Sequence, residues 1–161
     1  MTTLEVSRNK IFDLAVLGNR LAMWRFLNNK IVFTNGCFDI LHRGHIAYLS
    51  EARDRGDVLI IGLNSDASVQ RIKGNGRPVQ DEMSRALILA SLRFVDAVVL
   101  FDEDTPYELI KLVKPDVLVK GGDYTEETIV GAGFVKENGG EVVTIPIVEG
   151  YSTSNVLNAI K

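Results

Sequence analysis

Residues 30–55 have the sequence KIVFTNGCFDILHRGHIAYLSEARDR, in which an apolar run is followed closely by an amphipathic one. The run from Lys30 to Gly36 predicts a buried strand that ends at a glycine. The stretch from Gly44 to Arg55 predicts a helix with one apolar face. Between them lies His42-Arg43-Gly44-His45, the HRGH turn. Its imidazoles lie beside the free N–H groups and the positive end of the predicted helix, where anions bind. We therefore expect a phosphate site at this turn.

Strand-like segments recur along the chain and are hydrophobic nearly throughout, as in strands covered on both faces. They are 31–35, 57–63, 96–100, 116–119 and 142–145. Helical patterns alternate with them at 44–55, 65–72, 81–92, 105–113, 126–138 and 153–160. Such alternation implies parallel strands joined by right-handed crossovers. We therefore predict an α/β fold, a single domain with a Rossmann-like, doubly wound, parallel five-stranded sheet.

The residues before the first of these strands have apolar side chains at helical spacing. These are Ile11, Leu14, Leu17, Leu21 and Trp24. The pattern predicts an amphipathic helix over 7–28, which could cover the sheet or supply an interface between two copies. We therefore divide the chain into an N-terminal helical extension, residues 1–29, and a domain at 30–161.

The composition argues against several classes of protein. A net charge of −3 provides no concentrated basic face for nucleic acid, and no apolar stretch approaches the length of a membrane span. Glu5, Arg8 and Lys10 interrupt the N-terminus where a secretory signal needs an unbroken apolar segment. Cys37 is the single cysteine, which excludes an internal disulfide and fits a reducing compartment. We expect a cytoplasmic protein that binds neither nucleic acid nor membrane.

The predicted topology gathers polar segments at one edge of the sheet, since ligands of such folds bind beyond the carboxyl ends of the strands. The first strand leads into Asn35-Gly36-Cys37-Phe38-Asp39, and the second leads into Asn64-Ser65-Asp66. The fourth leads into the KGGDY segment (Lys120–Tyr124), and the fifth into Gly150-Tyr151 and the STS turn (Ser152–Ser154). The STS turn also has the composition of a helix N-cap. Together these segments predict one shared site.

His42 and His45 have two other interpretations, a metal site and a structural role. Zinc would need further ligands, but the chain has no third histidine and its cysteine lies five residues before His42. In a structural role, one histidine would cap the helix. The glycine between them, Gly44, favours a close approach of the backbone to a ligand. Phosphate binding is therefore the preferred interpretation, and we assign no metal to the protein's own side chains.

The stretch from Thr34 to His45 resembles the signature of the cytidylyltransferase-like nucleotidyltransferases that share an HxGH motif. Further similarities are Asn64-Ser65-Asp66, Arg71-Ile72-Lys73-Gly74, Arg77-Pro78-Val79, the KGGDY segment and Gly150–Asn155. Together they resemble the branch that acts on D-glycero-β-D-manno-heptose 1-phosphate. The resemblance implies adenylyl transfer from ATP to this sugar phosphate, giving ADP-heptose and pyrophosphate for lipopolysaccharide core or surface glycan synthesis.

The resemblance also implies roles for individual residues. The catalytic residues would be His42 and His45, donating hydrogen bonds to the α- and β-phosphates, and Lys73, bridging the triphosphate and the substrate phosphate. On its own, Lys73 would be a solvated lysine at a helix C-terminus. The β- and γ-phosphates would lie at Ser152, Thr153 and Ser154. The other nucleotide-binding residues would be Thr34, Asn35, Gly36, Phe38, Gly44, Lys120, Gly121 and Asp123.

Two arginines and two aspartates have weaker assignments. Arg77 and Arg85 are candidates for contacts with the substrate phosphate, although Arg85 could instead form a surface ion pair within a helix. Asp39 and Asp66 would order loops or approach magnesium. We expect Mg²⁺ to be held mainly by the ATP phosphates, because the sequence shows no cluster of carboxylates of the kind that two-metal catalysis needs.

The implied chemistry needs no general base. A sugar phosphate has a second pKa of about 6, so the attacking oxygen is already ionised at neutral pH. Catalysis then depends on positioning and on stabilising charge at the transferring and leaving phosphates.

One departure bears on the nucleotide. Related cytidylyltransferases have an Arg-Thr pair before their final Ser-Thr motif, whereas this chain has Ile147-Val148-Glu149-Gly150 there, which weakens the case for CTP. Two alternatives remain: a cytidylyltransferase acting on glycerol 3-phosphate or a similar small phosphate, and a non-catalytic nucleotide-binding module. Relatives are often fused behind a sugar kinase, for which this chain has no room, so we expect a separate kinase. Homodimers are usual among them, and a homodimer is expected.

Overall fold

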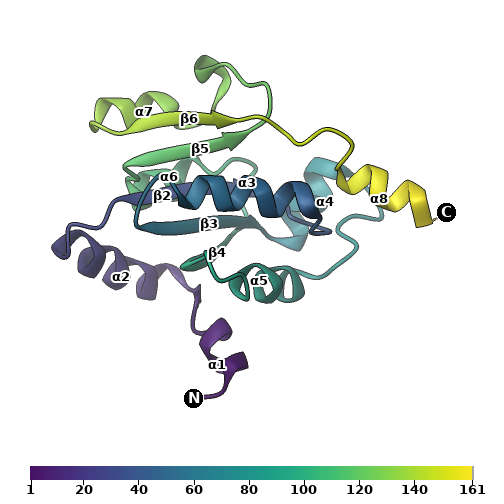
Figure 1. The fold of residues 1–161 in the computed structure, drawn as a ribbon, viewed down its shortest axis with the longest axis horizontal. Coiled ribbons are helices and arrows are strands. Elements are labelled where there is room, and N and C mark those ends of the chain that lie inside the picture. Colours follow the sequence, from purple (N-terminus) through teal and green to yellow (C-terminus); the bar gives the residue numbers. More distant parts are fainter. Residues whose placement is uncertain (161) are drawn as a thin grey trace.

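The computed structural model describes residues 1–160 and contains a six-stranded parallel sheet with strand order β1-β4-β3-β2-β5-β6 (Figure 1). The strands are β1 (Ile11–Phe12), β2 (Ile31–Gly36), β3 (Val58–Asn64), β4 (Ala97–Phe101), β5 (Val117–Gly121) and β6 (Glu141–Ile145). The helices are α1 (Thr3–Arg8), α2 (Leu14–Phe26), α3 (Arg43–Arg53), α4 (Asp66–Lys73), α5 (Glu82–Ala90), α6 (Tyr107–Val113), the 3₁₀ helix η1 (Glu126–Thr128), α7 (Ala132–Glu137) and α8 (Thr153–Ile160). The predicted parallel, Rossmann-like α/β architecture is confirmed.

Helices cover both faces of the sheet, which explains why its central strands are apolar without interruption. Successive side chains of a strand point to opposite faces. Ile31 and Phe33 of β2 therefore lie in a core closed by α2, α6 and α7. Val32, between them, lies in a second core closed by α3 and α5. This is the doubly wound arrangement that the sequence predicts.

The prediction of one helix over 7–28 and of five strands is wrong at the N-terminus. Ile11 and Phe12 form β1, which pairs with Val98 and Val99 of β4 and adds a sixth strand at the edge of the sheet. A new helix, α2, begins after Asp13, whose carboxylate accepts a hydrogen bond from the N–H of Val16 at 2.7 Å. Residues 1–29 are therefore not purely helical, because the edge of β4 offers backbone partners that periodicity cannot reveal.

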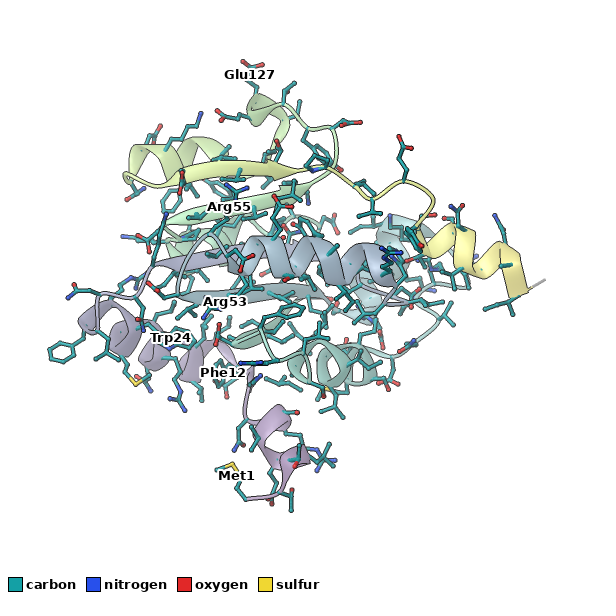
Figure 2. The ribbon with its side chains drawn as sticks, in the orientation of Figure 1. Met1, Phe12, Trp24, Arg53, Arg55 and Glu127 are labelled. Carbon is teal, nitrogen blue, oxygen red and sulfur yellow. The ribbon has the colours of Figure 1, made fainter. Side chains whose placement is uncertain are left out.

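Helix α2 performs the covering role considered for it. Leu17, Leu21 and Trp24 are buried in the first core, and Figure 2 shows Trp24 near Phe12, with ring centroids 6.4 Å apart. Met23, Phe26 and Leu27 of the same segment stay exposed.

The helix predicted over 126–138 is divided into η1 and α7, separated by Gly131 with a φ of +83°. Within residues 1–160, no helix is both long enough and apolar enough to cross a membrane.

Candidate active site

A cavity of about 430 Å³ opens where β2 and β5 end, between the start of α3 and the segment that leads into α8. Most residues predicted for the site line it. They are Asn35, Gly36, Phe38, His42, Gly44, His45, Lys73, Arg77, Lys120, Gly121, Ser152, Thr153 and Ser154. The parallel topology brings together segments more than a hundred residues apart in the sequence, as the sequence predicts for one shared site.

The two imidazoles of the HRGH turn are stacked on each other, with ring centroids 3.8 Å apart and an interplanar angle of 23°. His42 is the N-cap residue of α3, and its Nδ1 accepts a hydrogen bond from the N–H of Gly44 at 3.1 Å. The structural role considered from the sequence is therefore present in His42. Because Nδ1 accepts, the proton of the neutral ring lies on Nε2, which makes Nε2 a hydrogen-bond donor.

His45 is held in an unusual electrostatic state. Its Nδ1 is buried and has no hydrogen-bond partner among the described residues. Burial, with the neighbouring His42, lowers the pKa of His45 to about 4; the nearby Ile40 carbonyl opposes this shift. Burial also lowers the pKa of His42. Both rings are therefore neutral at pH 7, and a bound polyanion would raise their pKa values by favouring the charged form.

Gly44 is closely surrounded by neighbouring side chains of the protein. A Cβ at this position would lie 3.0 Å from atoms of the His42 ring and 3.2 Å from the Cβ of Tyr151. The sequence suggested an approach to a ligand; the structure shows that the glycine also allows the capping imidazole and Tyr151 to pack against α3.

Cationic side chains surround the cavity. Lys73 is the exposed last residue of α4 and precedes Gly74, whose φ is +91°. Lys120 follows β5's buried residues, and its Nζ lies 5.7 Å from the ring centroid of Tyr124. Burial lowers the pKa of Lys120, and the positive charge of Lys73 acts in the same direction. The charged form of Lys120 is thus disfavoured, and a bound anion would oppose this effect.

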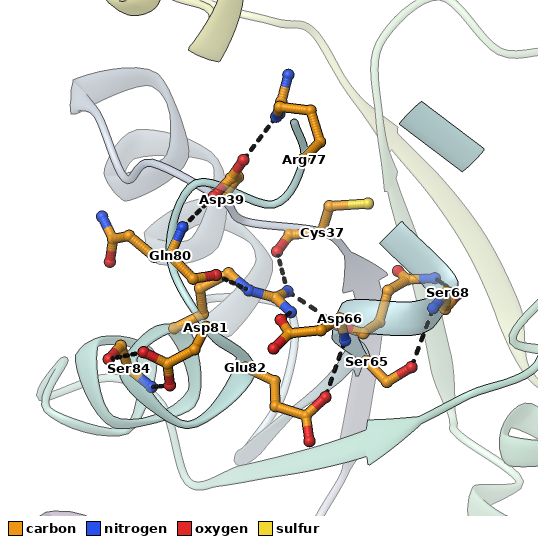
Figure 3. A network of polar contacts seen from close by, with 12 residues as sticks. Cys37, Asp39, Ser65, Asp66, Ser68, Arg77, Gln80, Asp81, Glu82 and Ser84 are labelled. Carbon is orange, nitrogen blue, oxygen red and sulfur yellow. Dashed lines mark hydrogen bonds and ion pairs between the residues drawn. The ribbon is translucent and has the colours of Figure 1, made fainter. Parts of the chain in front are cut away.

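Arg77 is fixed by a buried aspartate (Figure 3). The carboxylate of Asp39 accepts a hydrogen bond from Nε of Arg77 at 2.6 Å and further bonds from the N–H groups of Val79 and Gln80. Burial alone would raise the pKa of Asp39, but these hydrogen bonds and the guanidinium hold it below its usual value. Asp39 thus orders the loop between α4 and α5, one of the roles expected for it.

Arg85 lies outside the cavity, contrary to the expectation of a phosphate contact, and its ion pair is not on the surface. Its side chain is fully buried and donates hydrogen bonds to the carbonyls of Cys37, Asn64 and Gln80, and to the Asp66 carboxylate at 2.8 Å (Figure 3). The bonds to Cys37, Asn64 and Asp66 join α5 to the ends of β2 and β3, and the bond to Gln80 ties α5 to the loop that precedes it. The buried guanidinium therefore connects the loops that surround the site.

Two further predicted residues do not line the cavity. Thr34 is buried, and its hydroxyl is hydrogen-bonded to that of Tyr48. Tyr48 takes its place in the lining, and burial raises its pKa to about 12. Asp123 is exposed and is absent from the cavity lining. The Asn64-Ser65-Asp66 segment makes hydrogen bonds within the protein, since Asn64 donates one to the hydroxyl of Ser68 at 3.0 Å and Ser65 caps α4.

Sequence reasoning did not assign five residues that line the cavity. They are Cys37, Tyr48, Tyr124, Ile147 and Tyr151. Three are tyrosines, Tyr124 and Tyr151 within motifs and Tyr48 in α3, and the sequence does not show which of these side chains turn inward. The STS turn has the predicted cap, because the hydroxyl of Ser152 accepts a hydrogen bond from the N–H of Asn155 at 3.0 Å.

The described part of the chain has no group of three or more His, Cys, Asp or Glu side chains that could hold a metal ion. Asp39 is the carboxylate among the residues that line the cavity, and its oxygens are occupied by Arg77 and two backbone N–H groups. These side chains do not fit a metal site built by the protein alone. A divalent cation would have to arrive with an anionic ligand.

Residues 33–157 match the sequence profile described as cytidylyltransferase-like, and the chain belongs to this family of nucleotidyltransferases. The family resemblance noted from the HRGH turn and its associated motifs is thereby confirmed.

Two curated relatives are similar to most of this chain. The chain is 52% identical over 152 residues to the bifunctional protein HldE of Methylobacillus flagellatus, covering 94% of this chain and 31% of the relative. It is 59% identical over 134 residues to that of Campylobacter jejuni, covering 83% and 28%. The chain thus spans about a third of the length of these curated relatives.

Solved structures agree with the fold. A lipopolysaccharide core biosynthesis protein from Thermoplasma volcanium is 30% identical, with a TM-score of 0.61 over 77% of this chain and 99% of that chain. A pantoate-β-alanine ligase from Francisella tularensis, complexed with β,γ-ATP and β-alanine, has a TM-score of 0.64 over 92% of this chain and 76% of that chain, at 16% identity. The second likeness concerns the fold alone.

Proposed function

We propose that this nucleotidyltransferase transfers the adenylyl group of ATP to D-glycero-β-D-manno-heptose 1-phosphate, giving ADP-heptose and pyrophosphate for lipopolysaccharide core or surface glycan synthesis. The observation that carries the proposal is the stacked pair of neutral imidazoles at the start of α3, which share one cavity with the STS turn and with Lys73, Arg77 and Lys120. The high identity to HldE proteins and the name of the Thermoplasma volcanium relative support the choice of sugar nucleotide.

The arrangement suits displacement at a phosphorus atom. An oxygen of the sugar phosphate attacks the α-phosphorus, a new P–O bond forms, and the bond to the bridging oxygen of the β-phosphate breaks. The electron pair of that bond leaves with pyrophosphate, and no proton transfer is needed because the attacking phosphate is already ionised. His42 and His45 together donate to the α- and β-phosphate oxygens, His42 through Nε2 of a ring whose orientation the Gly44 hydrogen bond fixes.

The other side chains divide the remaining negative charge. Lys73, on a helix end followed by a glycine, reaches the acceptor phosphate and the triphosphate together. The free N–H groups and hydroxyls of the STS turn receive the β- and γ-phosphates, because a helix N-terminus favours anions. The proposed cofactor, Mg²⁺, would be held mainly by the triphosphate and would supply neutralisation of phosphate charge.

Pyrophosphate release from the purified protein tests the proposal. ATP and CTP are each supplied with heptose 1-phosphate, other sugar 1-phosphates and glycerol 3-phosphate. Turnover is expected with ATP and heptose 1-phosphate, and replacement of His45 by Ala is expected to abolish it. Turnover with CTP alone would favour the cytidylyltransferase alternative, and nucleotide binding without any turnover would favour a binding module.

We also propose that the protein acts in the cytoplasm, where ATP is available, and that it is a homodimer. Exposed apolar side chains at the end of α2, notably Phe26 at 85% exposure, support an interface there. Light scattering coupled to size-exclusion chromatography tests the oligomeric state. A monomeric mass at micromolar protein concentration would exclude the dimer.

A further inference from the structure

Helix α8 is attached to the rest of the protein in an unusual way. None of its residues is buried, and Figure 1 shows it projecting beyond the ends of the strands. Helices this short are marginal in water on their own. Because the STS turn lies at its start, its position determines whether the phosphate-binding groups face the HRGH turn.

Tyr151, the residue before the STS turn, packs against the HRGH turn. Its ring stacks beside that of His42, with centroids 6.4 Å apart and an interplanar angle of 29°. The guanidinium carbon of Arg43 lies 5.7 Å from the centroid of the Tyr151 ring, and Nη1 of Arg43 lies 3.5 Å from the hydroxyl oxygen. The Tyr151 Cβ also packs at Gly44, where an added Cβ would lie only 3.2 Å from it. Tyr151 therefore contacts three of the four residues of the HRGH turn.

We propose that Tyr151 is a positioning residue, which holds the STS turn against the HRGH turn so that both halves of the phosphate site are in place before nucleotide binds. This inference rests on the proposed function for the identity of the nucleotide. The ring supplies the contact area with His42 and Arg43, and the hydroxyl contributes little because its distance to Arg43 is long.

A positioning role has a specific kinetic signature. When a binding-competent arrangement is populated only in part, the apparent dissociation constant rises in inverse proportion to that population. Nucleotide contacts both halves of the site, so saturating nucleotide restores the arrangement even without Tyr151. Loss of the ring therefore raises KM for ATP and leaves kcat nearly unchanged. Global unfolding would instead lower kcat at constant KM, since only the amount of active protein would change.

The chain provides a matched control on another helix. Tyr107 of α6 contacts Phe134 edge to face, with ring centroids 6.5 Å apart, and Nζ of Lys111 lies 5.2 Å from the centroid of the Tyr107 ring. Its exposure, 40%, is close to the 37% of Tyr151. Tyr107 thus has the same kinds of contact but does not line the cavity.

The experiment compares Tyr151→Ala, Tyr151→Phe and Tyr107→Ala in the full chain. For Tyr151→Ala, we expect the KM for ATP and the Kd for α,β-methylene-ATP with Mg²⁺ to rise about tenfold, equivalent to about 1.4 kcal/mol. Tyr151→Phe should stay within about twofold of wild type and Tyr107→Ala should be unchanged, because each keeps the ring that contacts the HRGH turn.

A second measurement is independent of the acceptor and of nucleotide. Hydrogen exchange of the backbone amides of α8, in protein without ligand, should be faster in Tyr151→Ala than in wild type and unchanged in Tyr107→Ala. Failure of wild type to use heptose 1-phosphate would refute the proposed function but not this inference. Wild-type exchange rates and analogue affinity in Tyr151→Ala, or a loss of kcat at constant KM, would overturn it.

Discussion

Replacement of the buried Arg85 by Leu separates a structural role from a catalytic one. The guanidinium donates to the carbonyls of Cys37, Asn64 and Gln80 at 2.7 to 3.0 Å, and Leu would leave all three without this donor. Each unsatisfied buried group costs about 1–3 kcal/mol. The Asp66 carboxylate is 41% exposed, so water replaces its partner at little cost. Because the bonds to Cys37 and Gln80 are only partly buried, we expect a loss of about 3–5 kcal/mol in the free energy of unfolding, the lower part of the range for three such groups.

Urea unfolding monitored by the fluorescence of Trp24, the single tryptophan, measures this loss. The control is Arg71→Leu, because Arg71 pairs with Asp104 at 2.9 Å but is 47% exposed, and such surface pairs contribute less than about 1 kcal/mol. The reasoning would be refuted by an Arg85→Leu variant that unfolds at the wild-type urea concentration while turnover disappears, since Arg85 would then act on substrate.

Three further predictions concern the cavity. Lys73→Ala should reduce turnover by about a hundredfold, because charge stabilisation is lost, and should leave the free energy of unfolding unchanged. The control is Lys111→Ala, which removes another surface lysine and should match wild type in the same pyrophosphate assay. Folding lowers the pKa of His45 from 6.5 to about 4, so the unfolded chain takes up the proton at a higher pH than the folded chain. The free energy of unfolding should therefore fall as the pH drops from 6.5 to about 4. A His45→Phe variant with the same pH dependence in urea unfolding would contradict this. Gly44→Ala should impair nucleotide binding, since the added Cβ would lie 3.0 Å from the His42 ring. Gly18→Ala, whose added Cβ has nothing within 4 Å, should preserve binding and raise the melting temperature slightly. Equal affinities of the two variants for nucleotide, measured by calorimetry, would show that the close packing at Gly44 is unimportant.

Much of the fold is predictable from the sequence because it depends on local pattern. The uninterrupted apolar run at Ile31–Thr34 requires cover on both faces, and strand–helix alternation then leaves few topologies. The same topology places the HRGH turn, the KGGDY segment and the STS turn at one edge. The two-residue strand β1 was missed because its pairing with β4 is a tertiary event, and two residues carry no period of their own.

The site was predictable to the level of segments and less so for single side chains. Arg85 reads as a helix-surface residue, and its burial depends on carbonyl groups from three separate segments that only the folded chain brings together. Thr34 was expected at the nucleotide, but the Tyr48 hydroxyl takes its hydrogen bond. The sequence reveals no role for Tyr151, because its contacts with Arg43 cross more than a hundred residues of sequence.

A structure of the protein with α,β-methylene-ATP and Mg²⁺ is the most direct test of phosphate binding by the stacked histidines. Phosphate oxygens should lie about 2.7–3.2 Å from Nε2 of His42 and of His45, with the STS turn on the opposite side of the triphosphate. A triphosphate bound elsewhere, with both Nε2 atoms lacking a phosphate partner, would contradict the account.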